Sequence, residues 1–328
     1  MNSTVKYVIK TVFKAISLII AISILTFVLA ELSPIDPVKA YVGAESTVSQ
    51  EQKDLIAERW GLDESPVSRF FKWGNAILHL DFGTSQIYGV PVLTVIKKGA
   101  ANSFALMSVS WLLSGIIGFF AGLLAAAYRD RLLDRIIRTF CYILSSTPTF
   151  WVGILLLLIF SVQLKIFPIG MSAPIGVLAS DVTIWDRIHH MILPALTLSI
   201  LGVAQLAMFT REEMIKVFNS EYALFAHAKG LKTGEIIKKH GIRNVLIPAV
   251  TIQFASLSEL FGGSVLAENV FSYAGLGSVT VEAGTKVDLP LLLGITIITS
   301  MVVFTGNMIA NLLYPVIDPR IKEGQYGK

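Results

Sequence analysis

Residues 99–128 read GAANSFALMSVSWLLSGIIGFFAGLLAAAY, a stretch that contains no Asp, Glu, Lys or Arg. A helix that crosses a bilayer needs about 20 largely apolar residues, and this stretch is longer than that. Similar stretches recur at 139–164, 188–210, 244–267 and 289–317. Residues 15–30 are also apolar, and Lys14 can extend to the interface so that this run begins near Thr11. The pattern predicts an all-α, polytopic membrane protein with six transmembrane helices.

The composition excludes an ordinary soluble domain. Hydrophobic residues make up 54% of the 328 positions and charged residues 15%, against roughly 25% charged in average soluble proteins. The net charge of +4 is modest, and we do not interpret it as nucleic-acid binding. Cys141 is the single cysteine, so no intrachain disulfide can form, and its apolar neighbours favour a structural role.

Two features near these spans leave alternatives open. The N-terminal lysines before an apolar run that ends at Ala30 are also typical of a signal peptide. Loss of that span would place the two termini on opposite sides of the membrane, so we favour a retained helix. The short uncharged stretches 166–180 and 269–281 contain Gly and, in the first, Pro, and we predict loops or re-entrant segments there.

The distribution of Lys and Arg predicts the orientation. Basic residues concentrate in the N-terminal tail, in 129–138, in 211–243 and in the tail 318–328. The loops 165–187 and 268–288 contain few. Because positively charged loops stay in the cytoplasm, we predict an N-in, C-in protein of the bacterial cell membrane.

The extracytoplasmic loop 31–98 has helix signals of its own. Ser49 and Gln52 form a capping-box pattern, and Gly61 can end the helix that they begin. Ser65-Pro66 marks a second helix start. We predict a small helical cap; two interfacial helices lying on lipid are the alternative.

The segment 211–243 is too long and too patterned for a simple connector. Tyr222, Phe225 and Ala226 fall at helical spacing and predict one apolar face, and Gly230 can end that helix. Thr233 is expected to cap a second helix. Such a helix can dock in a partner's groove or rest on the inner leaflet.

Several motifs resemble those of binding-protein-dependent ABC importer permeases, in their peptide/nickel branch. The coupling motif of that family resembles AHAKGL at 226–231 together with KHGIRNVLIP at 239–248. Relative to the general Glu-Ala-Ala-x-x-x-Gly pattern aligned on Gly230, the Glu and the first Ala are absent. Further matching runs span nearly the whole chain: SPIDP at 33–37, LDFGTS at 80–85, PTFW at 148–151, ILPALT at 192–197, FSYAGLG at 271–277 and DPR at 318–320.

The resemblance implies a division of labour among subunits. Such a permease pairs with a second, homologous permease, two ATP-binding subunits and an extracytoplasmic substrate-binding protein. It implies no cofactor, and the sequence has no G-x-x-x-x-G-K-[ST] for its own ATPase site. The residues expected to couple it to the ATPase are Glu221, Tyr222, Phe225, Ala226 and Gly230.

The expected organisation follows from the spans and the resemblance. Residues 1–30 form the tail and first helix, 31–98 the outer loop, 99–317 the importer transmembrane domain with the coupling segment 211–243 inside it, and 318–328 a cytoplasmic tail.

Glu259 is the one acidic residue inside a predicted span, about midway along the fifth. A charge there costs roughly 2.5–3.5 kcal/mol on insertion scales, so it should face the bundle interior. We predict that it lines the translocation path; a helix-pairing role is the alternative. Gly118 and Gly122 form a GxxxG pattern that favours helix packing. His189 and His190 are too few for a metal site, and a polar helix start explains them.

Two other classes of protein compete with an importer. A membrane enzyme is disfavoured because the chain has neither H-E-x-x-H nor G-x-S-x-G. A passive channel would not need the patterned segment 211–243. Within the importers, ELFGG at 259–263 and ENVF at 268–271 resemble the nickel members more, so the expected substrate is nickel or a nickel chelate, with di- and oligopeptides the alternative.

Overall fold

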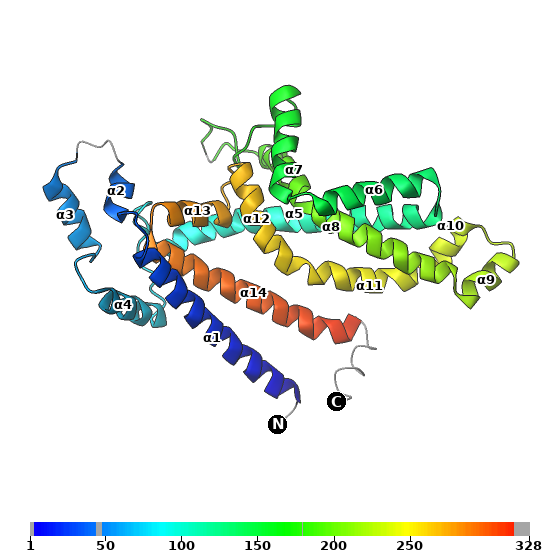
Figure 1. Ribbon diagram of the computed structural model, residues 1–328, viewed down its shortest axis with the longest axis horizontal. Helices are drawn as coiled ribbons and strands as arrows, with labels where there is room; N and C mark the ends of the chain where they lie inside the picture. Colours follow the sequence, from blue (N-terminus) through cyan, green and yellow to red (C-terminus); the bar gives the residue numbers. More distant parts are fainter. Residues whose placement is uncertain (1–2, 44–47, 179, 318–328) are drawn as a thin grey trace. The chain divides into compact units, whose positions relative to one another are not determined.

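A computed structural model describes residues 3–43, 48–178 and 180–317, and this part of the chain is helical, without an extended strand (Figure 1). The chain divides into two compact units. Unit 1 comprises Met1–Ser103 and Ala274–Thr305; unit 2 comprises Phe104–Tyr273 and Gly306–Lys328. Two of the three boundaries fall within long helices, α5 (Val92–Ala127) and α14 (Leu289–Ile317), and the third, between Tyr273 and Ala274, falls between two helices.

Unit 1 combines the first helix with the loop 31–98. Its other helices are α1 (Ser3–Glu31), α2 (Pro37–Val42), α3 (Gln50–Arg59), α4 (Pro66–Leu78) and α13 (Leu276–Thr285). Its largest buried cluster joins the start of α5 to α13 and α14 through Val92, Ile96, Leu276, Ala283, Leu291 and Ile295. Phe27 of α1 packs in a second cluster with Leu289 and Leu293 of α14.

The local helix signals of the loop 31–98 are confirmed. The Ser49 hydroxyl accepts from the Gln52 backbone N–H at 3.3 Å, and the Gln52 side chain accepts from the Ser49 N–H at 3.2 Å. Gly61 follows α3 with φ +67°, a conformation that suits glycine. Ser65 caps α4, with Pro66 in its first turn. These short-range rules therefore placed both helices correctly.

Unit 2 contains the second part of α5 and the long helix α8 (Ile184–Phe218). Around them lie α6 (Leu132–Ser146), α7 (Thr149–Leu156) with its π-helical continuation η1 (Leu157–Gln163), α9 (Glu221–Ala228), α10 (Thr233–Ile236), η2 (Ile237–Gly241), α11 (Ile242–Ala255) and α12 (Leu257–Val270). Buried clusters join α6 to α8 and α8 to α11, and Figure 1 shows these helices side by side.

Small residues let α5 and α8 approach closely. A Cβ at Gly118 would lie 3.0 Å from the Val203 carbonyl oxygen, and one at Gly122 would collide with the Ala207 carbonyl oxygen. The GxxxG pattern is therefore a packing surface, as predicted. Cys141 is 2% exposed in the cluster between α6 and α8, which agrees with a structural role.

Four helices in the described part are long and apolar enough to cross a membrane, and the number rises to six if each of two bent helix pairs is one span. The four lie in α1, α5, α8 and α14. The bent pairs are α6 with α7, at 109°, and α11 with α12, at 59°. The prediction of an all-α protein with several membrane-spanning helices is confirmed, and the count of six stays a prediction.

Two predicted spans are interrupted in the structure, and one predicted loop or re-entrant segment contains the start of a helix. The single span 139–164 is interrupted at Pro148, because Thr147 before it takes an extended conformation (φ −102°, ψ 131°) that ends α6. The span 244–267 is interrupted at Ser256. Residues 269–281, which were expected to form a loop or a re-entrant segment, contain the start of α13 at Leu276. The predicted tail 318–328 lies outside the described residues.

Candidate functional site

The segment after α8 folds into the short helix that the sequence predicts. The Ser220 hydroxyl accepts from the Ala223 N–H at 3.4 Å, which caps the first turn of α9. Gly230 has φ +87° and ends the turn after the helix, a conformation that L-residues with a side chain rarely adopt. One detail was wrong: Thr233 lies inside α10, and the preceding Lys232 is the capping residue, its N–H donating to Glu235 at 2.9 Å.

The two faces of α9 differ from the prediction. Ala226 is 5% exposed and packs with Ala223 and Ile236, whereas Phe225 is 63% and Tyr222 44% exposed. The predicted common face therefore does not exist, because Ala223 rather than an aromatic residue completes the buried side. Two alanines pack the buried side of α9 against the rest of unit 2, and the larger apolar side chains of the helix are exposed.

The exposed residues of α9 include Glu221, Tyr222, Leu224 and Phe225. Lys229 lies over the Phe225 ring, with Nζ 4.4 Å from the ring centroid, a cation–π contact. The Tyr222 side chain is held in position because the Asn244 amide donates a hydrogen bond to its hydroxyl at 3.3 Å. Much of the surface is thus held in place while remaining accessible.

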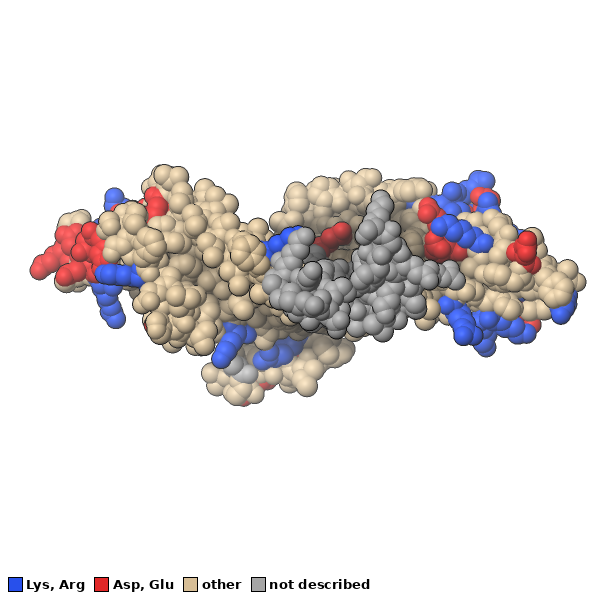
Figure 2. Space-filling model, turned by 90° about the horizontal axis from the view of Figure 1, so that it is seen from below, with Lys and Arg blue, Asp and Glu red and all other residues tan. Residues whose placement is uncertain are grey.

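Basic side chains surround this part of unit 2. Figure 2 shows Lys and Arg side chains gathered at the end of the molecule where Figure 1 places α9 and α10. The sequence supplies them from 229–243 and from the loop between α5 and α6. Figure 2 also shows Asp and Glu side chains there, so the apolar residues of α9 lie in a charged region with an excess of basic side chains.

Glu259 lies in the first turn of α12, three residues after the interruption at Ser256, rather than in the middle of a continuous span. Its side chain is exposed in this chain. It borders a small cavity of about 40 Å³ in unit 2, which is lined by Ser114, Thr149, Leu198, Leu201, Gly202, Ser256, Glu259, Leu260 and Gly263. None of the ion pairs among the described residues includes Glu259.

The two histidines at the start of α8 bind backbone carbonyl groups. His189 Nε2 lies 3.1 Å from the Ile166 oxygen, and His190 Nδ1 lies 2.8 Å from the Gly170 oxygen. A carbonyl oxygen only accepts, so each ring nitrogen donates. Both side chains thereby hold the loop that follows η1.

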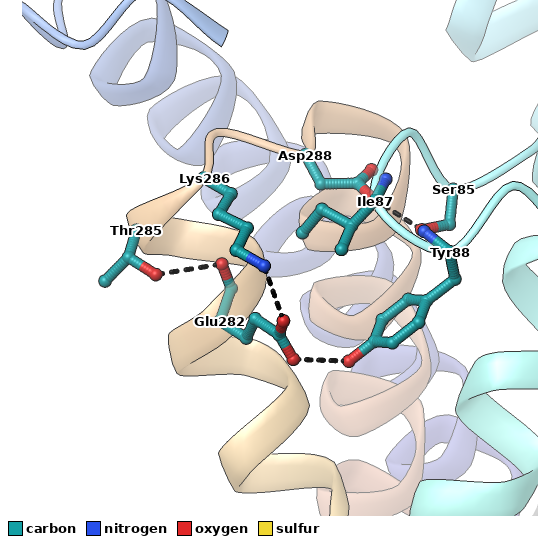
Figure 3. A network of polar contacts seen from close by, with 7 residues as sticks. All are labelled: Ser85, Ile87, Tyr88, Glu282, Thr285, Lys286 and Asp288. Carbon is teal, nitrogen blue, oxygen red and sulfur yellow. Dashed lines mark hydrogen bonds and ion pairs between the residues drawn. The ribbon is translucent and has the colours of Figure 1, made fainter. Parts of the chain in front are cut away.

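A polar network in unit 1 was not anticipated from the sequence (Figure 3). The fully buried Asp288 accepts from the Ser85 hydroxyl at 2.6 Å, from the Ile87 N–H at 3.0 Å and from the Leu291 N–H at 3.1 Å. It therefore caps α14 and holds the turn at 85–87 at once. An Asp directly before the apolar run 289–317 was the available signal.

The network continues through two further contacts. Figure 3 shows Tyr88 and Lys286 both directed at Glu282; the Tyr88 hydroxyl donates at 2.6 Å and Lys286 Nζ at 2.9 Å. These two donors hold the pKa of the Glu282 carboxyl below its ordinary value. Burial and the nearby Glu282 carboxylate raise the pKa of the Tyr88 hydroxyl.

Comparison with known families decides the class. The model of the binding-protein-dependent transport system inner membrane component matches residues 118–323, more than half of the chain. A second model, for the N-terminal part of such membrane components, matches residues 4–94. The chain belongs to this permease family.

Individual relatives match this chain over nearly its whole length. The oligopeptide transport system permease protein AppB of Bacillus subtilis is 35% identical over 96% of this chain and 99% of its own. A Sinorhizobium fredii protein named "Probable peptide ABC transporter permease protein y4tP" is 31% identical over 96% of this chain and 99% of its own. One solved structure, of the MetNI methionine ABC transporter in inward-facing conformations, covers 67% of this chain and 97% of its own at 16% identity, with a TM-score of 0.49.

The permease is thus the membrane component of an ABC importer, a multi-pass protein of the bacterial inner membrane. It is a transport subunit rather than an ATPase. In the described part of the permease, no group of three His, Cys, Asp or Glu side chains is placed to hold a metal ion.

Proposed function

We propose that this permease translocates di- or oligopeptides inward across the cytoplasmic membrane. The observation that carries the proposal is the likeness over nearly the full length to proteins named as oligopeptide and peptide permeases. The residues 259–263 and 268–271 had favoured nickel, but these names support the peptide alternative instead. Nickel or a nickel chelate therefore becomes the comparison substrate in the test.

The proposal includes an ATPase docking site on α9. Tyr222, Leu224 and Phe225 are 44%, 58% and 63% exposed on a helix whose other side is fixed by Ala223 and Ala226. Large apolar side chains grouped on a polar surface are typical of a protein interface. A short amphipathic helix fits a groove in a partner, and two ATP-binding subunits, one on this chain and one on a second homologous permease, supply the energy.

The proposed orientation places α9 in the cytoplasm. Helix α9 lies within the basic segment 211–243, the segment 129–138 is basic as well, and positively charged loops remain inside. The loop 31–98 and the region of Asp288 then face outward, where a substrate-binding protein delivers its cargo. This N-in, C-in arrangement agrees with the family's need for ATP at one side and a binding protein at the other.

Glu259 is proposed to contribute to the translocation path. Its carboxylate is exposed in the single chain beside a cavity, and exposure of a charge to lipid is costly. A second permease covering this face would turn the carboxylate toward a shared path. The ammonium group of a peptide is a suitable ligand for it there.

The experiment is uptake in the native host after deletion of this gene. Cells carrying the wild-type gene on a plasmid should restore accumulation of a labelled peptide, and inactivation of the partner ATPase that copurifies with the permease should abolish it. Nickel accumulation is measured in the same cells. Restored nickel uptake without peptide uptake would overturn the peptide proposal, and flux that persists without the ATPase would indicate a channel.

A further inference from the structure

One acidic residue in unit 2 lies among arginines that the orientation rule counts only as positive charge. Asp134, in the first turn of α6, is 0% exposed. Arg211 of α8 binds it in a bidentate manner, with Nε 2.7 Å from Oδ1 and Nη2 2.8 Å from Oδ2. The Asp130 N–H donates to Oδ2 at 2.9 Å, and Arg138 Nε lies 3.5 Å from Oδ1. Both carboxylate oxygens are therefore bound.

Stability alone is a weak reason for such a pair. Taking two charges out of water costs several kcal/mol, and apolar residues in place of a buried pair are often neutral or stabilising. The bidentate geometry does, however, fix the position of α6 relative to α8. Here it joins the first turn of α6 to α8 at Arg211.

The pair lies close to the proposed docking helix. Arg211 precedes Phe218, the last residue of α8, by seven positions, or about 10 Å along a helix. Phe218 packs against the cluster of Ala223, Ala226 and Ile236 that anchors α9. A displacement of α9 therefore acts on the end of α8 that carries Arg211.

The other end of α6 leads to the cavity at Glu259. After α6 the chain turns at Pro148, and Thr149, the first residue of α7, lines that cavity. The opposite wall includes Leu198 and Gly202 of α8. Movement of α8 alone would change the cavity wall differently from movement of α8 and α6 together.

We propose that Asp134 is a positioning residue that, through Arg211, makes α6 move with α8 when α9 is displaced. The proposal rests on the proposed function, in which an ATPase acts on α9. Asp134 is fully buried within the chain, so it acts through the helices it joins. The Nε of Arg138 has no hydrogen-bond partner among the described residues. Because it lies 3.5 Å from the Asp134 carboxylate, Arg138 can replace Arg211 as the paired cation if Arg211 shifts.

The test uses the complete importer, purified through a tag on this chain and reconstituted in liposomes. Peptide transported and ATP hydrolysed are measured together for wild type, Asp134→Asn, Arg211→Lys and the exchanged pair Asp134→Arg with Arg211→Asp. The matched control is Arg135→Gln, which removes an exposed arginine from the same helix. Copurification of the ATP-binding subunits is checked for each.

We expect Asp134→Asn to retain its ATPase subunits and hydrolyse ATP while peptide transported per ATP falls about fivefold or more. The exchanged pair should recover part of that ratio, and the control should equal wild type. Should Asp134→Asn fail to assemble, Arg211→Lys decides, because it keeps the charge but loses the bidentate bond. An unchanged ratio in the assembled variants would overturn the proposal. Absence of ATP-dependent uptake in wild type would instead overturn the proposed function beneath it.

Discussion

The Ser85 hydroxyl donates a 2.6 Å hydrogen bond to the carboxylate of Asp288, across 203 positions of sequence. Asp288 is fully buried and also caps α14 through the Leu291 N–H. One side chain thus holds residues 85–87 of the loop 31–98 to the start of the candidate membrane helix α14. Figure 3 shows this contact together with the one between Tyr88 and Glu282.

Asp288→Ala should lower the stability of the permease. It leaves the Ser85 hydroxyl and two backbone N–H groups without their acceptor, and each buried unsatisfied group costs about 1–3 kcal/mol. A thermal melt of the purified permease measures the loss. Ser180→Ala is the control, since its exposed hydroxyl bonds only the neighbouring Asp181. Equal melting temperatures for the two variants would contradict this role.

The contacts of Glu282 predict that the stability of the permease depends on pH, both in acid and in strong alkali. The pKa of Glu282 is lowered, so its contribution to stability is present above its ordinary pKa and is lost as pH falls through the folded value. The pKa of Tyr88 is raised, so its contribution is present below its ordinary pKa and is lost as pH rises beyond it.

Melting curves across pH, compared between wild type, Glu282→Gln and Tyr88→Phe, measure these contributions. The difference between wild type and Glu282→Gln should shrink in acid, and that between wild type and Tyr88→Phe should shrink in strong alkali. Both effects are expected to be small because the Glu282 side chain is 39% exposed. Differences that stay constant with pH would rule out the network as their source.

Gly122→Ala should destabilise the contact between α5 and α8. The added Cβ would collide with the Ala207 carbonyl oxygen and lie 2.6 Å from the Thr210 Cβ, so one backbone must move. Overpacking of this kind costs about 1–3 kcal/mol. Gly262→Ala is the matched control, because nothing lies within 4 Å of its Cβ position. A thermal melt in which both variants equal wild type would be inconsistent with close packing there.

Glu259→Gln should reduce peptide uptake severalfold and leave the melting temperature unchanged. Gln keeps the size and hydrogen-bonding capacity of the side chain and removes only the charge that we propose faces the path. Initial uptake rates at several peptide concentrations measure the effect, with Glu212→Gln, an exposed carboxylate on α8, as the control. Wild-type uptake by Glu259→Gln would assign the residue a packing or pairing role.

The parts of the fold that sequence predicted are those governed by neighbours along the chain. The capping box of Ser49 and Gln52, and the helix between Ser220 and Gly230, depend on residues a few positions apart. Hydrophobic length placed the helices α1, α5, α8 and α14 for the same reason. Which face of α9 is buried depends instead on Ile236 and Phe218, so it could not be read from α9 alone.

Proline shows why the break between α6 and α7 was missed. Pro194 and Pro248 remain inside α8 and α11, because a membrane helix can tolerate the lost hydrogen bond, whereas Pro148 separates α6 from α7. The residue type is the same in each case, and the tertiary surroundings decide the outcome. The ion pair of Asp134 with Arg211, 77 positions apart, is equally a product of the fold.

The docking of an ATPase on α9 is the central claim, and Phe225→Asp tests it most directly. The assembled importer is purified through this chain and ATP-dependent peptide uptake is measured in liposomes, beside the control Val67→Asp, which places the same charge at a 66% exposed apolar residue of α4. We predict that Phe225→Asp, 63% exposed in the single chain, loses its ATP-binding subunits and its uptake, because the interface would bury an unpaired charge. Val67→Asp should keep both. Full uptake with bound ATPase in Phe225→Asp would contradict the account.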